Sequence, residues 1–322
     1  MFLSILIPNY GFSELTVRCI ESIKSQTINK DVEIIICDQS DDSDRNSLLK
    51  TVSNISNARV VTLDKPDVLS ARKTLIQEAV GKYVFFVDSD DYIDQNYITQ
   101  LIQVIKKLKY PDLIITSYYI DKKNSCIKND DLSFINDTNF ITYFYCSDLV
   151  NTLWRKIFRK SLFDLRESSN LRSTNGDDWI ISLSIVKNAK TICFEPSLCG
   201  YHYCMNDSSL THTMTLERFE KSFSLKDDFL LSLEEINYQL LFKSKMTKFL
   251  SFCIISYREN KNKNIIKSSF AFVRNNFFNV LKIPRNAAHG LKQKLLYFII
   301  KHKLFFLFFD IIKKSAKKSS NQ

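Results

Sequence analysis

A regular alternation along the first 120 residues constrains the fold most strongly. Short apolar runs, which predict strands, alternate with amphipathic stretches, which predict helices. Strands separated in this way by helices indicate a parallel sheet that helices cover on both faces, so we predict an α/β fold. The predicted strands are 2–7, 32–37, 59–63, 83–87 and 113–118, and the predicted helices are 14–26, 45–52, 69–80 and 95–108.

Helix ends and strand ends add detail to this prediction. Ser13 is expected to cap the first helix, and Gly81 to end the third in a left-handed conformation. Polar residues follow three of the strands, and ligands of parallel sheets bind beyond such strand ends. The sequence therefore predicts a ligand site built from Asn9 and Tyr10, Asp38, and the run 88–91.

The run VFFVDSDDYID, residues 84–94, places four acids behind an apolar strand. Asp88 and Asp90 alternate along an extended segment, so both carboxylates can reach one site. Carboxylates without neighbouring sulfur or imidazole suit Mg²⁺ or Mn²⁺, which commonly carry substrate phosphates. The alternative is a solvated acidic turn before the next helix, and Asp94 fits that alternative because acids favour helix starts.

Glycine and cysteine usage exclude other classes of site. The chain has five glycines and no GxGxxG or GxxxxGK[ST] motif, which excludes the glycine loops that cradle phosphate. None of the eight cysteines forms a CxxC pair. This pattern predicts reduced, mostly buried thiols in a cytosolic protein and argues against a zinc site. The apolar N-terminus is too short for a signal peptide and lacks a basic start.

Three segments in order, SILIPNY, EIIICDQSDDSD and LSARKTLIQEAVGKYVFFVDSDDYID, resemble the inverting family-2 glycosyltransferases of the GT-A fold. The resemblance continues more loosely to about residue 213. It implies a Rossmann-like, mostly parallel sheet flanked by helices. It also implies transfer of a sugar from a nucleotide-diphosphate sugar, a UDP-sugar, to a glycan or polyprenyl-diphosphate-linked acceptor in bacterial surface polysaccharide synthesis. The implied cofactor is Mn²⁺ or Mg²⁺.

The same resemblance implies how the nucleotide is held. Pro8 and Tyr10 match the segment that packs on the base, with Tyr10 as a stacking surface, and Asp38 matches the acid that hydrogen-bonds the pyrimidine. Two residues differ from the family's usual pattern: Gln39, which follows Asp38, and Lys73, which follows Arg72. Without the resemblance, Tyr10 could be a simple loop aromatic, and Asp38 could merely end its strand.

For the diphosphate and the metal, the resemblance implies roles for an arginine and the acidic pair. Arg72 matches the arginine that reaches the diphosphate or the base region. Asp88 and Asp90 match the pair that holds the ribose and the metal, with Asp90 favoured as the direct metal ligand. The alternative for Arg72 is a pair with a helix acid such as Glu78, or an exposed position.

The segment STNGDDWI resembles the acidic pair at which these enzymes deprotonate the acceptor. Asp178 matches the catalytic base, Asp177 shapes the acceptor pocket, and Trp179 packs behind them. The alternative is an acid pair that stabilises a helix N-terminus. A later stretch, YHYCMNDSSLTHT, resembles the cover of the diphosphate, so His202 and His212 are candidates for the diphosphate or the metal, although a lone histidine is more often structural.

The charge is divided along the chain. Residues 241–322 carry 18 basic and 2 acidic side chains, a net charge of +16, whereas residues 1–240 carry −6. We predict a catalytic domain over 1–222 and a basic helical region over 223–322. Two six-residue apolar runs flanked by lysines, 295–300 and 304–309, favour an element in the interface of an anionic membrane.

Other interpretations of this tail stay open. It could be an apolar helix packed on the catalytic domain, and its charge alone could also suit a nucleic acid. No DNA-binding motif accompanies the charge and the front half is acidic, so no nucleic-acid partner is expected. The competing function is a non-catalytic GT-A-like binding module, or a protein that its tail recruits to membrane or nucleic acid. The predicted location is cytoplasmic, peripheral on the inner face of the cell membrane.

Overall fold

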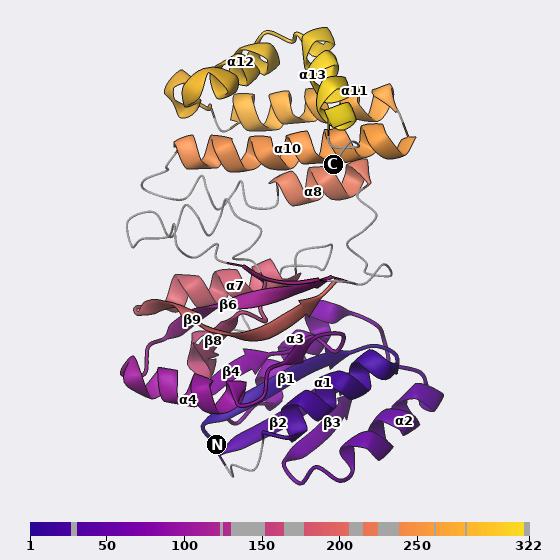
Figure 1. Cartoon of the computed structure of the whole chain (residues 1–322), viewed down its shortest axis with the longest axis vertical. Coiled ribbons are helices and arrows are strands. Elements are labelled where there is room, and N and C mark those ends of the chain that lie inside the picture. The colour runs from indigo at the N-terminus through magenta and orange to yellow at the C-terminus, as the bar shows by residue number, and fades with distance from the viewer. Residues whose placement is uncertain are drawn as a thin grey trace. The chain divides into compact units, whose positions relative to one another are not determined.

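The computed structural model describes most of the chain (Figure 1). Its described residues fall into two compact units. The sheet unit contains the described residues from 1 to 129 and from 152 to 205, and the helical unit contains those from 215 to 318. The described residues are 1–26, 31–122, 125–129, 152–163, 177–205, 215–224, 238–260, 262–280 and 282–318.

The first half of the sheet unit alternates strands and helices as the sequence predicts. Every predicted element is present, with its ends shifted by a few residues, and Ser13 is the N-cap of the first helix. A two-residue strand, β5, was not predicted. The elements are β1 (Leu3–Asn9), α1 (Glu14–Lys24), β2 (Val32–Asp38), α2 (Asp42–Val52), β3 (Ala58–Thr62), α3 (Val68–Glu78), β4 (Tyr83–Phe86), β5 (Tyr92–Ile93) and α4 (Tyr97–Lys107).

The second half of this unit adds the remaining strands. Strand β6 is the last predicted strand, and it is longer than predicted. The elements are β6 (Leu113–Lys122), β7 (Ser125–Asn129), β8 (Lys156–Arg159), the 3₁₀ helix η3 (Lys160–Leu162), α7 (Asp177–Asn188) and β9 (Ile192–Cys204).

The strands form one sheet in the order β3-β2-β1-β4-β8-β6-β9-β5, and β7 pairs with β6. Strands β3, β2, β1 and β4 are parallel, as predicted. Strand β8 lies between β4 and β6 and is antiparallel to both, so the sheet is mixed beyond β4. The insertion of β8 was not predicted, because its pairing joins segments more than forty residues apart that show no local period.

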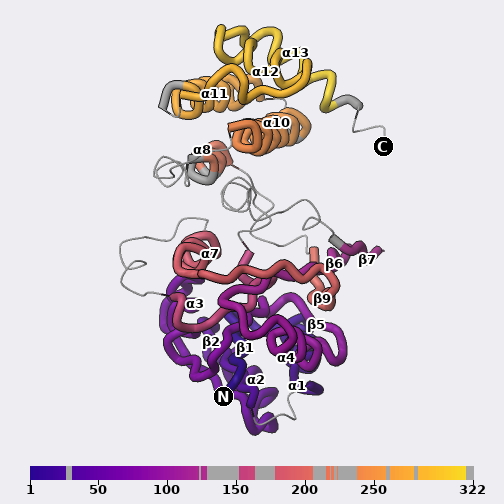
Figure 2. Tube along the Cα trace, turned by 90° about the vertical axis from the view of Figure 1, so that its left-hand side faces the viewer, coloured from indigo at the N-terminus to yellow at the C-terminus, as the bar shows by residue number. Residues whose placement is uncertain are grey.

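Alternating residues of the central strands fill two cores. One face packs on α1, α2 and α4 through residues such as Ile5, Ile34 and Phe85, which are buried. Helix α3 contacts β1 and β2, and α3 and α7 contact each other. The two sets of helices lie on opposite sides of the sheet in Figure 2. A parallel sheet covered on both faces explains why its strands are apolar throughout.

Gly81 serves a different purpose from the predicted one. Its φ is not in the left-handed region, where the described glycines are Gly11 and Gly290. A Cβ on Gly81 would come within 2.5 Å of Ser4 Oγ, and its backbone N–H donates to that hydroxyl at 2.8 Å. Glycine is therefore needed for the close approach of the α3–β4 turn to β1.

The helical unit has an aromatic core of its own. Phe219 stacks on Phe252 at 4.3 Å, and Phe249 stacks on Phe308 at 4.9 Å, so both predicted apolar runs of the tail contribute helices to this unit. The predicted boundary at residue 222 falls within its first helix. The elements are α8 (Leu216–Ser224), α10 (Tyr238–Asn260), α11 (Lys263–Val273), η4 (Arg274–Val280), η5 (Arg285–Ala287), α12 (Gly290–Lys301) and α13 (Phe305–Lys318).

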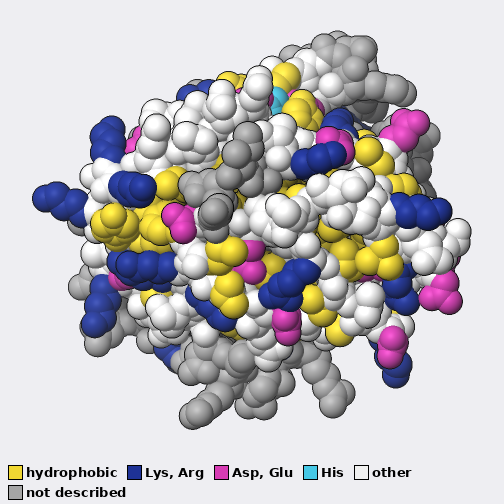
Figure 3. All heavy atoms as spheres, turned by 90° about the horizontal axis from the view of Figure 1, so that it is seen from below, with side chains coloured by type: hydrophobic (Ala, Val, Ile, Leu, Met, Phe, Trp, Pro, Cys, Tyr) yellow, Lys and Arg dark blue, Asp and Glu magenta, His cyan; other side chains and the backbone are white. Residues whose placement is uncertain are grey.

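Two surface properties bear on possible partners. Among the described residues, no helix combines the length and the apolar character that crossing a membrane requires. The face seen in Figure 3 carries basic and acidic side chains that are interspersed among hydrophobic patches rather than gathered by sign.

Candidate active site

The acidic run directly follows the buried strand β4 and turns sharply. The backbone N–H of Asp91 donates to the carbonyl of Asp88 at 3.0 Å. Asp88 and Asp90 are half-buried at the rim, whereas Asp91 is only 1% exposed. The pattern D-S-D-D therefore divides into two acids that can meet a ligand and one that belongs to the interior.

Asp91 joins this turn to β9. Its carboxylate accepts from the hydroxyl of Tyr201 at 2.5 Å and from the backbone N–H of Cys204 at 2.8 Å. The Tyr201 hydroxyl also accepts from the backbone N–H of Asp88 at 3.2 Å. The Tyr201 ring in turn stacks on Trp154 at 4.7 Å. Tyr201 therefore holds both ends of the acidic turn and fixes the direction in which Asp88 and Asp90 point.

Arg72 connects this turn to the start of α7. From α3, its guanidinium donates to Asp88 Oδ1 at 3.2 Å and forms a second, close ion pair with Asp178 Oδ1. Asp178 also accepts from the backbone N–H of Leu153 through Oδ2, at 3.2 Å. The alternative pairing of Arg72 with Glu78 is wrong, because Glu78 pairs with Arg59 at 2.7 Å.

The electrostatics of this group favour a further cation. Burial raises the pKa of Asp88 to about 6, Arg72 lowers it, and the charges of Asp178 and Asp90 raise it. Arg72 pairs with two carboxylates, those of Asp88 and Asp178, and the charge of Asp90 also acts on Asp88. Asp88 and Asp90 offer only oxygen donors, which fit Mg²⁺ or Mn²⁺, ions that take one or two carboxylates and complete their shell with water and phosphate.

The predicted nucleoside contacts follow the first two strands. Tyr10 lies just beyond β1 with 71% of its surface exposed, so its ring is open for stacking, and Pro8 is half-buried within β1. Asp38 is fully buried at the end of β2. Its Oδ1 accepts from Asn9 and Ser40 at 2.9 and 2.6 Å.

Asp38 is not saturated by these contacts. Its Oδ2 accepts from Arg45 Nε at 3.2 Å, and the two oxygens of a carboxylate can together accept about four hydrogen bonds. One acceptor position therefore remains beside Arg45. The Asp38 side chain has no exposed surface, whereas Arg45, which donates to it, is 24% exposed.

The structure describes only part of the predicted acceptor side and of the predicted diphosphate cover. Asp177 is the first residue of α7, and its side chain lies outside the described residues, as does His212. Trp179 is buried, with 5% of its surface exposed.

His202 faces two carboxylates that do not belong to the acidic pair. Its Nε2 lies 3.0 Å from Asp94 Oδ1, and its Nδ1 lies 3.1 Å from Asp121 Oδ1. The ring is stacked between Tyr92, at 4.3 Å, and Tyr119, at 4.9 Å. Asp94 is therefore not the helix-start residue that the sequence suggested. Asn96 occupies the N-cap of α4, and Asp94 turns its carboxylate to the imidazole.

Sequence reasoning also missed a basic contact beneath the turn. Arg18 of α1 donates to the carbonyl of Asp90 at 3.0 Å and lies over the ring of Tyr92 at 4.5 Å. Arg18 stands in no recognisable motif, and the stretch YHYCMNDSSLTHT, which contains Tyr201, directed attention to its histidines instead. The alternation of aromatic residues in YHYC was the one available signal for Tyr201, since alternate residues of a strand share a face.

The comparisons with known proteins agree with this geometry. The sequence model described as Glycosyl transferase family 2 matches residues 4–165, just over half of the chain. The chain belongs to glycosyltransferase family 2. It is therefore a glycosyltransferase, and the predicted enzyme class is confirmed. Divalent metals are generally associated with family 2.

Curated members of family 2 resemble most of the chain. The putative glycosyltransferase EpsH of Bacillus subtilis is 22% identical over 79% of this chain and 76% of its own. The poly(ribitol-phosphate) beta-N-acetylglucosaminyltransferase TarP of Staphylococcus aureus is 22% identical over 76% of this chain and 73% of its own. Other curated relatives are longer, and this chain spans less than a third of their length.

Solved structures confirm the GT-A fold. A crystal structure of residues 1–349 of S. aureus TarS, in complex with UDP-GlcNAc, superposes with a TM-score of 0.72 at 15% identity. The similarity covers 99% of this chain and 92% of that one, so it includes the helical unit. This family-2 glycosyltransferase is thus related to enzymes of bacterial polysaccharide-type biosynthesis.

Proposed function

We propose that this glycosyltransferase moves a hexosyl or N-acetylhexosaminyl group from a UDP-sugar to a glycan or polyprenyl-diphosphate-linked acceptor, with inversion and with Mn²⁺ or Mg²⁺. The observation that carries the proposal is the bridge from Asp88 through Arg72 to Asp178. This bridge joins Asp88 and Arg72, which we expect to bind the donor, to Asp178, which we expect to be the base. The activity in the name of TarP and the UDP-GlcNAc bound to TarS support a UDP-sugar donor.

The donor side of the proposed site follows the strand ends. Tyr10 stacks on the base, Asp38 accepts a hydrogen bond from it, and Asp88 holds the ribose. Arg72 meets the diphosphate with a planar, permanently charged group that suits bidentate contact with phosphate. Asp90 ligates the metal, which neutralises charge on the leaving diphosphate when it is bound.

On the acceptor side, Asp178 acts as the base. A general base must lie within hydrogen-bond reach of the hydroxyl that it deprotonates. Asp178 Oδ1 is occupied by Arg72 and Oδ2 by the N–H of Leu153. A diphosphate that draws Arg72 away would free Oδ1 for the acceptor hydroxyl, which places donor binding before proton transfer.

The metal requirement is tested by titrating the full chain with UDP, with and without Mn²⁺. We expect Mn²⁺ to strengthen UDP binding at least tenfold in the wild type and to have little effect in Asp90→Asn, as measured by calorimetry. Asp310→Asn is the control, because Asp310 is exposed on α13 of the helical unit and should leave the Mn²⁺ effect intact. UDP binding that is equally tight without metal would refute metal dependence.

A basic, apolar face of the helical unit supports membrane association. On α12, Leu291, Leu295 and Phe298 are 86%, 52% and 51% exposed. Their spacing of four and three residues places them on one side of the helix. The side chains of Lys292 and Lys294 are exposed beside them. We infer that this face inserts shallowly into an anionic bilayer, where the polyprenyl acceptor resides.

We expect the triple variant Leu291→Ser, Leu295→Ser, Phe298→Ser to bind anionic vesicles at least tenfold more weakly than the wild type. These side chains are exposed, so the loss should come without a change in melting temperature. Val80→Ser, which removes a 65% exposed side chain elsewhere, is the control in the same sedimentation assay. Equal binding of the triple variant and the wild type would exclude this face as the membrane contact.

A further inference from the structure

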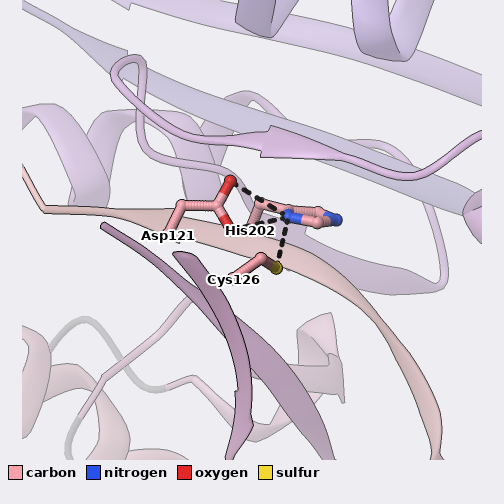
Figure 4. A group of neighbouring side chains, drawn as sticks. All are labelled: Asp121, Cys126 and His202. Atoms are coloured by element: carbon pink, nitrogen blue, oxygen red, sulfur yellow. Dashed lines mark hydrogen bonds and ion pairs between the residues drawn. The ribbon is translucent and has the colours of Figure 1, made fainter. Parts of the chain in front are cut away.

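Three neighbouring strands place an aspartate, a cysteine and a histidine together (Figure 4). Asp121 of β6 is the cross-strand partner of Cys126 on β7, and β9 supplies His202 from the other side of β6. Among the described residues, these three are the only group of potential metal ligands whose donor atoms all lie within 4.8 Å of one another.

The spacing suits a tetrahedral ion of zinc size. His202 Nδ1 lies 3.1 Å from Asp121 Oδ1 and 3.9 Å from Cys126 Sγ. Zinc bonds of about 2.0 Å to nitrogen and oxygen and about 2.3 Å to sulfur require edges of about 3.3 Å between nitrogen and oxygen and about 3.6 Å between nitrogen and sulfur. The observed separations lie within a few tenths of an ångström of these edges.

The surrounding contacts are those that orient metal ligands. His202 Nε2 faces Asp94 at 3.0 Å, so a proton on Nε2 leaves the lone pair of Nδ1 directed toward Asp121 and Cys126. Tyr92 donates to Asp121 Oδ2 at 2.5 Å. Histidine ligands commonly donate their second N–H to a carboxylate, which fixes the tautomer and the direction of the ring.

The types of donor atom indicate which ion suits this group. Asp121 offers a carboxylate oxygen, Cys126 a sulfur and His202 an imidazole nitrogen. Mixed nitrogen, sulfur and oxygen donors favour zinc over the Mg²⁺ or Mn²⁺ that suits the oxygen-only pair Asp88 and Asp90.

We propose that Asp121, Cys126 and His202 form a zinc site, with Asp94 and Tyr92 as supporting contacts and a fourth position for water. The ion fastens the β6–β7 hairpin to β9, the strand whose Tyr201 and Cys204 hold Asp91. The absence of CxxC pairs argued against zinc, but the strand pairing assembles the ligands from residues far apart in sequence. The site is independent of the proposed donor metal at Asp90.

Cobalt substitution of the metal-free full chain tests the site directly. Tetrahedral Co²⁺ with a thiolate ligand gives intense visible bands and a thiolate-to-metal charge-transfer band. We expect one equivalent of Co²⁺ to produce these bands in the wild type and one equivalent of Zn²⁺ to abolish them. Cys126→Ser should lose the charge-transfer band, and His202→Gln should bind cobalt at least a hundredfold more weakly.

Three further variants separate the loss of a metal ligand from a general loss of structure. Cys193→Ser, on the same strand as His202, should keep the full spectrum, whereas Asp94→Asn should weaken Co²⁺ binding about tenfold to a hundredfold, as loss of a supporting carboxylate does. Asp90→Asn should leave the bands unchanged, so this test does not depend on the proposed donor site. No charge-transfer band in the wild type, or a band that persists in Cys126→Ser, would overturn the proposal.

Discussion

Asp178→Asn is expected to lower sugar transfer by about 10²- to 10⁴-fold, the range that general acid–base catalysis contributes. Asparagine keeps the shape of the side chain but cannot take the proton of the acceptor hydroxyl. UDP affinity should change far less than turnover, because Asp178 acts on the acceptor side. UDP release, measured with a panel of UDP-sugars and glycan acceptors, is the suitable readout.

The substitution also removes the charge that pairs with Arg72, so its melting temperature must be measured in parallel. Asp178→Glu is the matched variant, since it keeps the charge while displacing the carboxylate, and it should retain part of the activity. Full turnover by a folded Asp178→Asn variant would show that another group is the base. UDP binding without turnover in the wild type would instead favour a non-catalytic binding module.

Arg72→Leu is expected to have the second large effect, on both stability and donor binding. It removes the guanidinium that pairs with both Asp88 and Asp178. Breaking a fully buried ion pair costs about 3–5 kcal/mol. Since Asp88 and Asp178 are 26% and 21% exposed, water screens part of this loss, and we expect about 1–3 kcal/mol from urea unfolding at pH 7.5.

The effect of Arg72→Leu should depend on pH in a defined direction. The pKa of Asp88 is raised to about 6 in the folded state, above the value of about 3.9 for an unfolded chain. The folded state therefore binds more protons between these values, and the contribution of Asp88 to stability falls as the pH rises through them. The leucine variant raises this pKa further, so its deficit should shrink at pH 5.

A deficit that is equal at pH 5 and pH 7.5 would show that repulsion between the carboxylates is not its cause. Arg72→Lys is the informative companion, because it restores the charge without the planar group. It should recover most of the stability but only part of the UDP affinity, since a single ammonium cannot contact two phosphate oxygens in a fork.

The sequence predicts the first half of the sheet well, because each element there carries its own period. Apolar strands and amphipathic helices are local signals, and the parallel order of β1, β2 and β4 follows from right-handed crossovers between them. The joining of Asp88, Arg72 and Asp178 was expected only through the family resemblance. Nothing in the local sequence places α7 beside α3.

The features that the sequence could not predict depend on pairing between strands that are far apart along the chain. β8 is four residues long and basic at both ends, so it lacks the signature of a central strand. Tyr201 reaches Asp91 across 110 residues, and His202 meets Asp121 across 81. Cys126 becomes a candidate ligand only because β7 folds back on β6. These contacts follow from topology rather than from composition or spacing.

The position of β8 also has a consequence for how the protein is made. During synthesis from the N-terminus, β4 and β6 emerge well before the strand that separates them. Both then present unpaired backbone edges, which are open to wrong pairing with each other or with another chain. We expect the nascent chain to pass through a stage that is prone to aggregation and ends when residues 156–159 enter the sheet. Slower translation between β6 and β8 would lengthen that stage, whereas a chaperone that covers strand edges would protect it.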